Sequence, residues 1–374
     1  MNFDPFSVWE IIAAIGLIAM LVQLFHYLVL FSRLSFYKVP VRQSAAEPVT
    51  VIICARNELK NLKANLESVL TQDYPDFQVV VVNDCSWDES GKYLEEIQPQ
   101  YPNLKIVTIN EQEKYRHGKK FALSLGIKAA SHDILLMTDA DCQPMSKNWI
   151  RTMVSGYRPG TEIVIGYGAY RKEPGLLNKW VRMDTVFNAV QYLSAALRRN
   201  TYMGVGRNLS YRKSLFFKNK GFASHNHIMS GDDDLFVNET ARPDNTIVEL
   251  QQDSFTGSST RNTFGGWLKQ KKRHMSTGNF YKSGHKMLIA SFFLSQFMFY
   301  AVAITLLVAG FQPVWVLSAI GLRLLVQLTI FGTSMKKLGE IDIIWMLPVF
   351  DIIVVLLYPS LSISNLLFKD KTWR

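Results

Sequence analysis

The sequence predicts an α/β domain with a mostly parallel sheet, flanked on both sides by helices long enough to span a membrane. Short apolar runs alternate with helix-length segments through the middle of the 374 residues, which is the order of βαβ units. Longer apolar stretches lie near the N-terminus and after Lys286. The formal net charge of +10 indicates contact with an anionic membrane face or with anionic substrates. The sequence contains no basic module with interleaved aromatic residues, so it does not indicate nucleic-acid binding.

The first apolar stretch, residues 8–31, exceeds the roughly 20 residues needed to cross the hydrocarbon core. It has no basic start and is too long for a signal peptide. We assign residues 1–33 to an N-terminal transmembrane helix. Basic residues follow this stretch and acidic residues precede or open it, so the positive-inside rule places the next domain in the cytoplasm. These charges are Arg33, Lys38 and Arg42 after the stretch, and Asp4 and Glu10 before or within it.

Four buried strands are expected in the first half of the soluble domain, with helices between them. The strands are 48–54, 77–82, 104–109 and 134–139, and the helices are 59–70, 91–97 and 121–130. Glu58, Asp84 and Asp139 follow or end three of these strands. Because the carboxyl ends of parallel strands lie at one edge of a sheet, we expect these carboxylates to face one site.

Asp139 and Asp141 are the strongest metal-binding candidates in the sequence. They offer two hard oxygen ligands at positions i and i+2, which suit Mg²⁺ or Mn²⁺ bound to a diphosphate. A solvated turn is the alternative, since an isolated Asp-x-Asp is common. The first strand lacks a following Gly-x-Gly-x-x-Gly, which argues against a dinucleotide-binding dehydrogenase, and no Walker-type lysine loop is present.

The second half of the domain contains a strand at 162–167, a long helix at 176–199 and a glycine-rich turn at 203–208. Asp232, Asp233 and Asp234 follow, and adjacent carboxylates raise one another's pKa. The same residues also suit a helix N-terminus, where acidic side chains are favourable. His225 and His227 are expected to be loop residues near an acceptor rather than a metal pair.

The order of four short motifs resembles the nucleotide-binding half of family 2 glycosyltransferases with the GT-A (Rossmann-like) fold. The motifs are Ala55-Arg56-Asn57-Glu58, Val81-Val82-Asn83-Asp84, Gly118-Lys119 and Thr138-Asp139-Ala140-Asp141. The resemblance covers residues 48–280 and implies a nucleotide-sugar donor with Mg²⁺ or Mn²⁺ held by Asp139 and Asp141. It also implies that the donor contacts Ala55, Arg56, Asn57, Glu58, Asp84, Lys119 and Asp139.

The resemblance continues into the second half of the domain. The family places an acidic pair before a helix, and its second member, the general base, corresponds to Asp233. Gln270 and Arg273 match the Gln-x-x-Arg-Trp signature of membrane enzymes such as cellulose synthase, hyaluronan synthase and ceramide glucosyltransferase, but His274 stands at the Trp position. The residues expected at the acceptor or diphosphate are Gly206, Asn208, Asp232, Gln270, Arg273 and His274.

Residues 287–368 form a C-terminal membrane region of two or three helical segments, at 287–309, 314–333 and 343–368. Arg323 lies within the second segment, where a charge needs a partner, and Asp351 in the third is available. Four simple spans would place the basic tail (Lys369, Lys371 and Arg374) outside. A hairpin or an interfacial third segment would resolve this conflict.

Together these features predict a multi-pass membrane enzyme with a cytoplasmic catalytic domain, in a bacterial-type inner or plasma membrane. The expected reaction is inverting transfer from a nucleotide-sugar, with a UDP-sugar as the expected donor, to a lipid, lipid-linked or glycan acceptor. One alternative is a processive polysaccharide synthase coupled to export, although the few spans and His274 count against it. Others are an inactive membrane scaffold or glycan-binding subunit and, from Arg323 and Asp351 alone, a transporter.

Overall fold

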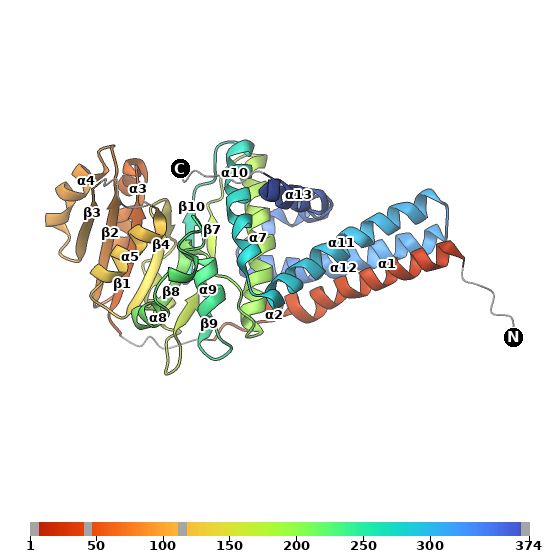
Figure 1. Ribbon diagram of the computed structural model, residues 1–374, viewed down its shortest axis with the longest axis horizontal. Helices are drawn as coiled ribbons and strands as arrows, with labels where there is room; N and C mark the ends of the chain where they lie inside the picture. Colours follow the sequence, from red (N-terminus) through yellow and green to blue (C-terminus); the bar gives the residue numbers. More distant parts are fainter. Residues whose placement is uncertain (1–6, 41–46, 111–117, 368–374) are drawn as a thin grey trace.

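The computed structural model describes residues 7–40, 47–110 and 118–367. An α/β domain lies at one end and long apolar helices extend from the other, with α7 (Leu176–Leu197) between them (Figure 1). Several residues used in the sequence analysis lie outside the described ranges: Asp4, Arg42, Lys369, Lys371 and Arg374.

The main sheet has seven strands in the order β3-β2-β1-β4-β8-β6-β9. Strands β1 to β4 are parallel to one another, whereas β8 is antiparallel to both β4 and β6. The predicted α/β fold with a mostly parallel sheet is therefore confirmed. The strands are β1 Val49–Ala55, β2 Phe77–Asp84, β3 Leu104–Ile109, β4 Ile134–Asp139, β6 Ile163–Ile165, β8 Leu209–Arg212 and β9 Thr246–Val248.

Helices cover both faces of the parallel strands, which explains why these strands are continuous apolar runs. Alternate residues of β1 face opposite sides. Val51 packs in a cluster with Leu62 and Leu66, whereas Ile52 packs in a cluster with Ile127. The helices of the domain are α3 Leu59–Leu70, α4 Ser90–Ile97, α5 Lys119–Ala129, α6 Trp149–Val154, α8 Lys213–Lys218, α9 Asp234–Thr240 and α10 Phe264–Met275.

A second, three-stranded sheet completes the edge of the domain where the predicted site lies. It contains β5 (Cys142–Pro144), β7 (Gly168–Tyr170) and β10 (Thr256–Ser258). Strand β10 pairs in antiparallel fashion with β5 and in parallel fashion with β7. The sheet thereby brings segments more than 100 residues apart next to Asp141. Sequence patterns did not predict it, because three-residue strands carry no detectable periodicity.

Within the part of the chain that the structure describes, four helical segments are long and apolar enough to cross a membrane: 8–35, 283–308, 313–337 and 341–365. The first contains α1 (Val8–Phe25), a π-helical turn at 26–31 and α2 (Ser32–Ser35). The others contain α11 (Ser283–Val308), α12 (Pro313–Lys337) and α13 (Leu347–Leu367). Helices α1, α11 and α12 extend side by side away from the sheets, whereas α13 lies close to α7 and α10 (Figure 1).

The predicted partnership between Arg323 and Asp351 is confirmed. An Nη1 atom of Arg323 lies 2.8 Å from Oδ2 of Asp351, and both side chains are almost completely buried. Nη2 of Arg323 donates to Oε1 of Gln23 and to the hydroxyl of Tyr27, while the amide of Gln327 donates to Asp351. These contacts satisfy a charge that would otherwise be costly among apolar helices.

Candidate active site

The carboxyl ends of β1, β2 and β4 open into a cavity of about 1570 Å³. The turn before β8, the start of α9 and one side of α10 complete its walls. The structure therefore brings the separate sequence motifs together in space. The predicted residues that line the cavity are Ala55, Arg56, Asn57, Glu58, Asp84, Lys119, Asp139, Asp141, Gly206, Asp232, Asp233, Gln270, Arg273 and His274.

The loops after β1 and β2 are tied together by Asn57. Its backbone φ of 55° is left-handed, a conformation that Asn tolerates better than most residues. Its side-chain oxygen accepts from the backbone N–H of Trp87 at 2.9 Å, and its own N–H donates to Ser86 at 3.0 Å. These bonds fix the backbone just before Glu58, which lies at the start of α3.

Asp84 is the clearest unsatisfied group in the cavity wall. Both of its carboxylate oxygens are buried, and neither has a hydrogen-bond partner among the described residues. An unpaired buried carboxylate is costly, so it is expected to be paired when the site is filled. A ligand with hydroxyl or N–H donors would supply the missing hydrogen bonds.

Asp139 and Asp141 fit a divalent cation. Their oxygens and the Cys142 sulfur lie within 4.8 Å of one another. Burial favours a raised pKa for Asp139, but the Lys119 ammonium holds that pKa below its ordinary value. Burial and the charge of Asp139 raise the pKa of Asp141, so a cation between the two carboxylates would stabilise both in the ionised form.

Cys142 is a poor third ligand for such an ion. Burial raises the pKa of its thiol well above the ordinary value, so the sulfur stays protonated. The thiol donates to Oδ1 of Asp141 at 3.5 Å. A hard divalent ion prefers carboxylate oxygen to a neutral thiol, which leaves the two aspartates as the metal-binding candidates.

Lys119 connects the two acidic parts of the site. Its Nζ lies 2.8 Å from Oδ1 of Asp139 and 3.1 Å from Oδ2 of Asp232. Burial disfavours the charged form, but these carboxylates raise the pKa of Lys119 well above its ordinary value. The ammonium group therefore remains charged. It lies in the first turn of α5, which begins two residues earlier than predicted.

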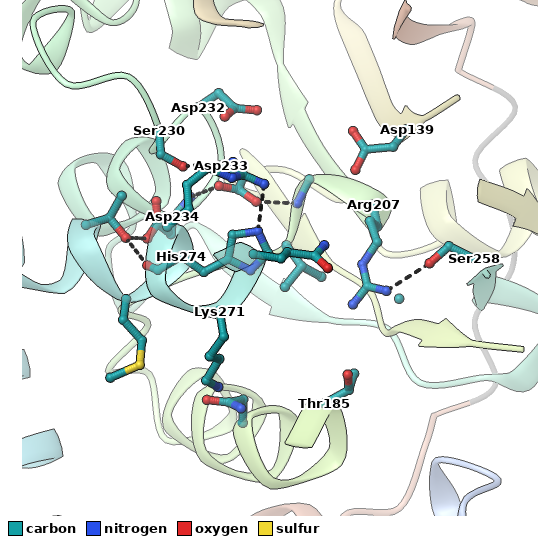
Figure 2. A pocket seen from close by; sticks show the side chains of 18 of the residues that line it. Asp139, Thr185, Arg207, Ser230, Asp232, Asp233, Asp234, Ser258, Lys271 and His274 are labelled. Carbon is teal, nitrogen blue, oxygen red and sulfur yellow. Dashed lines mark hydrogen bonds between the residues drawn. The ribbon is translucent and has the colours of Figure 1, made fainter. Parts of the chain in front are cut away.

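The three consecutive aspartates have different surroundings. Oδ2 of Asp233 accepts from the N–H of Gly206 at 2.7 Å, and Oδ1 accepts from the N–H of Asp234 at 2.8 Å (Figure 2). Burial and the charge of Asp232 raise the pKa of Asp233. The backbone donors thus orient the Asp233 carboxylate toward the cavity while one lone pair on each oxygen remains for another proton donor.

Asp234 is held by hydroxyl groups instead. Thr277 and Tyr281 both donate to its Oδ2, the latter at 2.7 Å. Burial and the neighbouring Asp233 raise the pKa of Asp234 to about 7. The Asp234 carboxylate therefore links α9 by hydrogen bonds to the segment after α10.

Helix α10 places three predicted residues against the cavity. Gln270 donates to the Tyr170 hydroxyl at 3.4 Å. Arg273 donates to Ser230 at 3.4 Å and to Nε2 of His274 at 3.1 Å. Burial and the Arg273 charge hold the pKa of His274 well below its ordinary value, so the ring is neutral.

Asn208 is not among the residues that line the cavity, and its contact with acceptor or diphosphate stays a prediction. The side chain is completely buried. Its oxygen accepts from Trp149 at 3.0 Å, and its amide donates to the main-chain carbonyls of Tyr167 and Ser254 at 3.0 and 2.7 Å. Asn208 therefore joins the turn before β8 to three neighbouring segments. Successive residues of a turn can point in opposite directions. The composition of the turn does not reveal which of them faces the cavity.

The two upstream histidines are also not among the residues that line the cavity, and the expectation that they lie near the acceptor stays a prediction. His225 is buried, and its Nδ1 lies 2.7 Å from Nζ of Lys120. His227 contacts the ring of Phe280. Lys120 also donates to two main-chain carbonyls of this loop, so His225 helps position the segment that leads to Asp232.

Sequence reasoning missed Arg207, which lies beside Asp139 in the cavity (Figure 2). Its guanidinium stacks over the Tyr170 ring at 4.3 Å and donates to Ser258 at 3.1 Å. The Arg207 charge adds to the effect of Lys119 in lowering the pKa of Asp139, and it opposes part of the rise in the pKa of Asp141. Its position between Gly206 and Asn208, both expected at the acceptor or diphosphate, was the available signal.

Comparison with known proteins agrees with this arrangement. Residues 50–219 match the family described as Glycosyl transferase family 2. Residues 50–219 therefore belong to family 2 of the glycosyltransferases. Its sheet domain has the GT-A fold.

Two curated relatives illustrate the similarity. A 187-residue segment is 29% identical to glycosyltransferase AglE of Haloferax volcanii and covers 50% of this chain and 58% of the relative. A 269-residue segment is 23% identical to poly-beta-1,6-N-acetyl-D-glucosamine synthase of Staphylococcus aureus and covers 70% of this chain and 60% of the relative. The chain thus matches about 60% of the length of each of these proteins.

A solved structure shares the fold over nearly the whole chain. It is the mannosyltransferase PcManGT from Pyrobaculum calidifontis, in complex with GDP-Man and Mn²⁺. The TM-score is 0.62, and the match covers 97% of this chain and 100% of that protein at 18% identity.

Proposed function

We propose that the protein is an inverting glycosyltransferase that transfers a sugar from a nucleotide-sugar to an acceptor hydroxyl at the cytoplasmic face of a membrane. The expected donor is a UDP-sugar, and the acceptor is a lipid, a lipid-linked sugar or a glycan. One observation carries this proposal: a single cavity contains the unpaired Asp84, the Asp139–Asp141 pair and the oriented carboxylate of Asp233.

The donor end of the cavity lies at the ends of the parallel strands. Asp84 and Glu58 would accept hydrogen bonds from the nucleoside, and Lys119 and Arg207 would contact the diphosphate. Asp139 and Asp141 would hold Mg²⁺ or Mn²⁺. When bound, that ion supplies positive charge that stabilises the diphosphate leaving group. The mannosyltransferase of similar fold was solved with GDP-Man and Mn²⁺, which supports this class of donor and cofactor.

Asp233 is the proposed general base. It would take the proton of the acceptor hydroxyl while that oxygen attacks the anomeric carbon and the bond to the diphosphate breaks. The two backbone N–H groups that hold Asp233 set its direction, and their hydrogen bonds offset part of the cost of burying the carboxylate. Arg273 and Arg207 add positive charge where negative charge develops on the leaving group.

The decisive test is a donor screen with purified full-length protein in membranes. Release of nucleoside diphosphate from UDP- and GDP-sugars would be measured with and without Mn²⁺. We expect metal-dependent release from at least one donor and its loss in Asp233→Asn when acceptor is present. A folded protein that releases nucleoside diphosphate from none of them would support the inactive scaffold instead.

A processive synthase is the second candidate, because one relative is a poly-beta-1,6-N-acetyl-D-glucosamine synthase. The departure at His274 counts against it, since a neutral histidine offers a smaller stacking surface than tryptophan. The length of the product made from labelled donor separates the two functions. Addition of a single sugar favours the transferase, and a ladder of long products favours the synthase.

A further inference from the structure

The cavity continues from the carboxylates to two of the membrane-spanning candidates. Ile289, Ala290 and Phe293 of α11 line one side, and Pro359 and Ser362 of α13 line the other. Both helices belong to segments whose mean hydropathy, 1.9 and 2.2, is high enough for a membrane. A catalytic cavity thus has a wall made from residues of apolar membrane helices.

The two helices touch at one level and leave an opening at another. Gln296 of α11 donates to Asp351 of α13 at 2.7 Å, and the rings of Phe293 and Tyr358 lie 5.3 Å apart. The cavity-lining residues Ala290 and Ser362 lie on the other side of this contact, toward α10, and both are exposed. The contact at Asp351 therefore joins the two helices at one level, and the cavity reaches both of them at the level of Ala290 and Ser362.

We propose that the acceptor is a membrane lipid whose chain enters between α11 and α13 and whose head reaches Asp233. This inference rests on the proposed transferase function and selects the lipid among its possible acceptors. Apolar side chains at the opening stabilise a hydrocarbon chain, whereas they offer few hydrogen bonds to a soluble glycan.

A buried polar cluster marks where the lipid head would begin. Nζ of Lys271 donates to Asp184 and to the Tyr358 hydroxyl, each at 2.8 Å, and Asn188 donates to the same hydroxyl at 3.2 Å. All four residues line the cavity between the opening and α10, and Lys271 extends from α10 toward α7 (Figure 2). These donors and acceptors would bind the polar head while the opening holds the chain. The sequence analysis identified Gln270, Arg273 and His274 on this helix but not Lys271.

The test blocks the opening from either side. Tryptophan would replace Ala290 or Ser362, two exposed residues on opposite walls, so one variant remains informative if the other misfolds. The matched control is Ile304→Trp on α11, because Ile304 is 61% exposed and lies roughly 21 Å along the helix from Ala290. Full-length proteins would be incubated with the labelled nucleotide-sugar and membranes of the organism that makes the protein.

Two quantities would be measured: label extracted into organic solvent and nucleoside diphosphate released. We expect unmodified protein and Ile304→Trp to place most of the label in the organic phase. Ala290→Trp and Ser362→Trp should lower that incorporation at least tenfold, while their nucleoside diphosphate release without acceptor falls less than threefold.

Two results would overturn the lipid entry. One is label that enters only water-soluble or insoluble glycan, and the other is Ala290→Trp and Ser362→Trp variants that transfer as well as the Ile304→Trp control. Failure of the proposed function gives a different result, because unmodified protein would then release no nucleoside diphosphate from any donor.

Discussion

Two clusters of buried charge differ in how completely the protein satisfies them. In the helix bundle, Arg323 and Asp351 pair with each other and receive further hydrogen bonds from glutamine and tyrosine side chains. In the cavity, Asp84 has no partner among the described residues, and the pKa of Asp141 is raised because burial and a second carboxylate oppose its charge. In the first cluster the two charges neutralise each other, although Nε of Arg323 and Oε1 of Gln327 have no hydrogen-bond partner among the described residues, whereas the second cluster is open to a ligand.

This difference distinguishes a structural charge from a functional one. Burying an ion pair within a bundle costs desolvation energy, and the attraction between the charges offsets that cost only when their geometry is good. Such a pair therefore mainly determines which helices pack together. An incompletely paired carboxylate in a cavity is costly until a ligand binds. The transporter alternative, which rested on Arg323 and Asp351, loses its basis because their hydrogen bonds are mostly to each other and to neighbouring helices.

Replacing the proposed base should have the largest effect in the open cluster. Asp233→Asn removes the proton acceptor but keeps the shape, so kcat for transfer should fall by about 10²- to 10⁴-fold. Steady-state kinetics with saturating donor would measure it. Asp234→Asn is the matched control, because Thr277 and Tyr281 can still donate to the amide oxygen. Equal loss in both variants would show that the acidic cluster acts through structure alone.

In the helix bundle, breaking the pair should cost stability. Arg323→Met leaves Asp351 buried and unpaired, which we expect to lower the free energy of unfolding by about 3–5 kcal/mol. Thermal unfolding in detergent would measure the change. The double variant with Asp351→Leu removes both charges and should recover most of the loss. If the double variant were as unstable as the single one, the pair would have a role beyond mutual neutralisation.

The metal-binding candidates should give a smaller effect than the base. Asp141→Asn removes one hard ligand, and transfer should fall about 10²- to 10³-fold, comparable to the loss of one preorganised group that stabilises charge. The Mn²⁺ concentration for half-maximal activity should rise as well. Titrating Mn²⁺ against activity tests both expectations. Unchanged activity without any divalent ion in the unmodified protein would contradict the proposed role of Asp139 and Asp141.

The sequence predicted the parallel half of the fold because long apolar strands and well-separated helices produce clear patterns. It also predicted that Glu58, Asp84 and Asp139 share one site, since that follows from strand direction alone. The strands β5, β7 and β10 were not predictable, because their three residues reflect pairing between distant segments. Arg207 and Asn208 show the same limit, since neighbouring residues of one turn face opposite ways.

The smallest expected effect on activity concerns Asn208. Although Asn208 lies next to the cavity, its replacement should mainly lower stability, as replacement of Arg323 does. Asn208→Ala would leave two main-chain carbonyls and the Trp149 N–H without a partner, so the free energy of unfolding should fall by about 1–3 kcal/mol. Because the side chain lies outside the cavity, the KM for donor should change less than threefold at a temperature where the variant is folded. Unfolding curves and donor titration would measure the two effects. A large rise in KM with unchanged stability would instead support the predicted contact of Asn208 with the diphosphate.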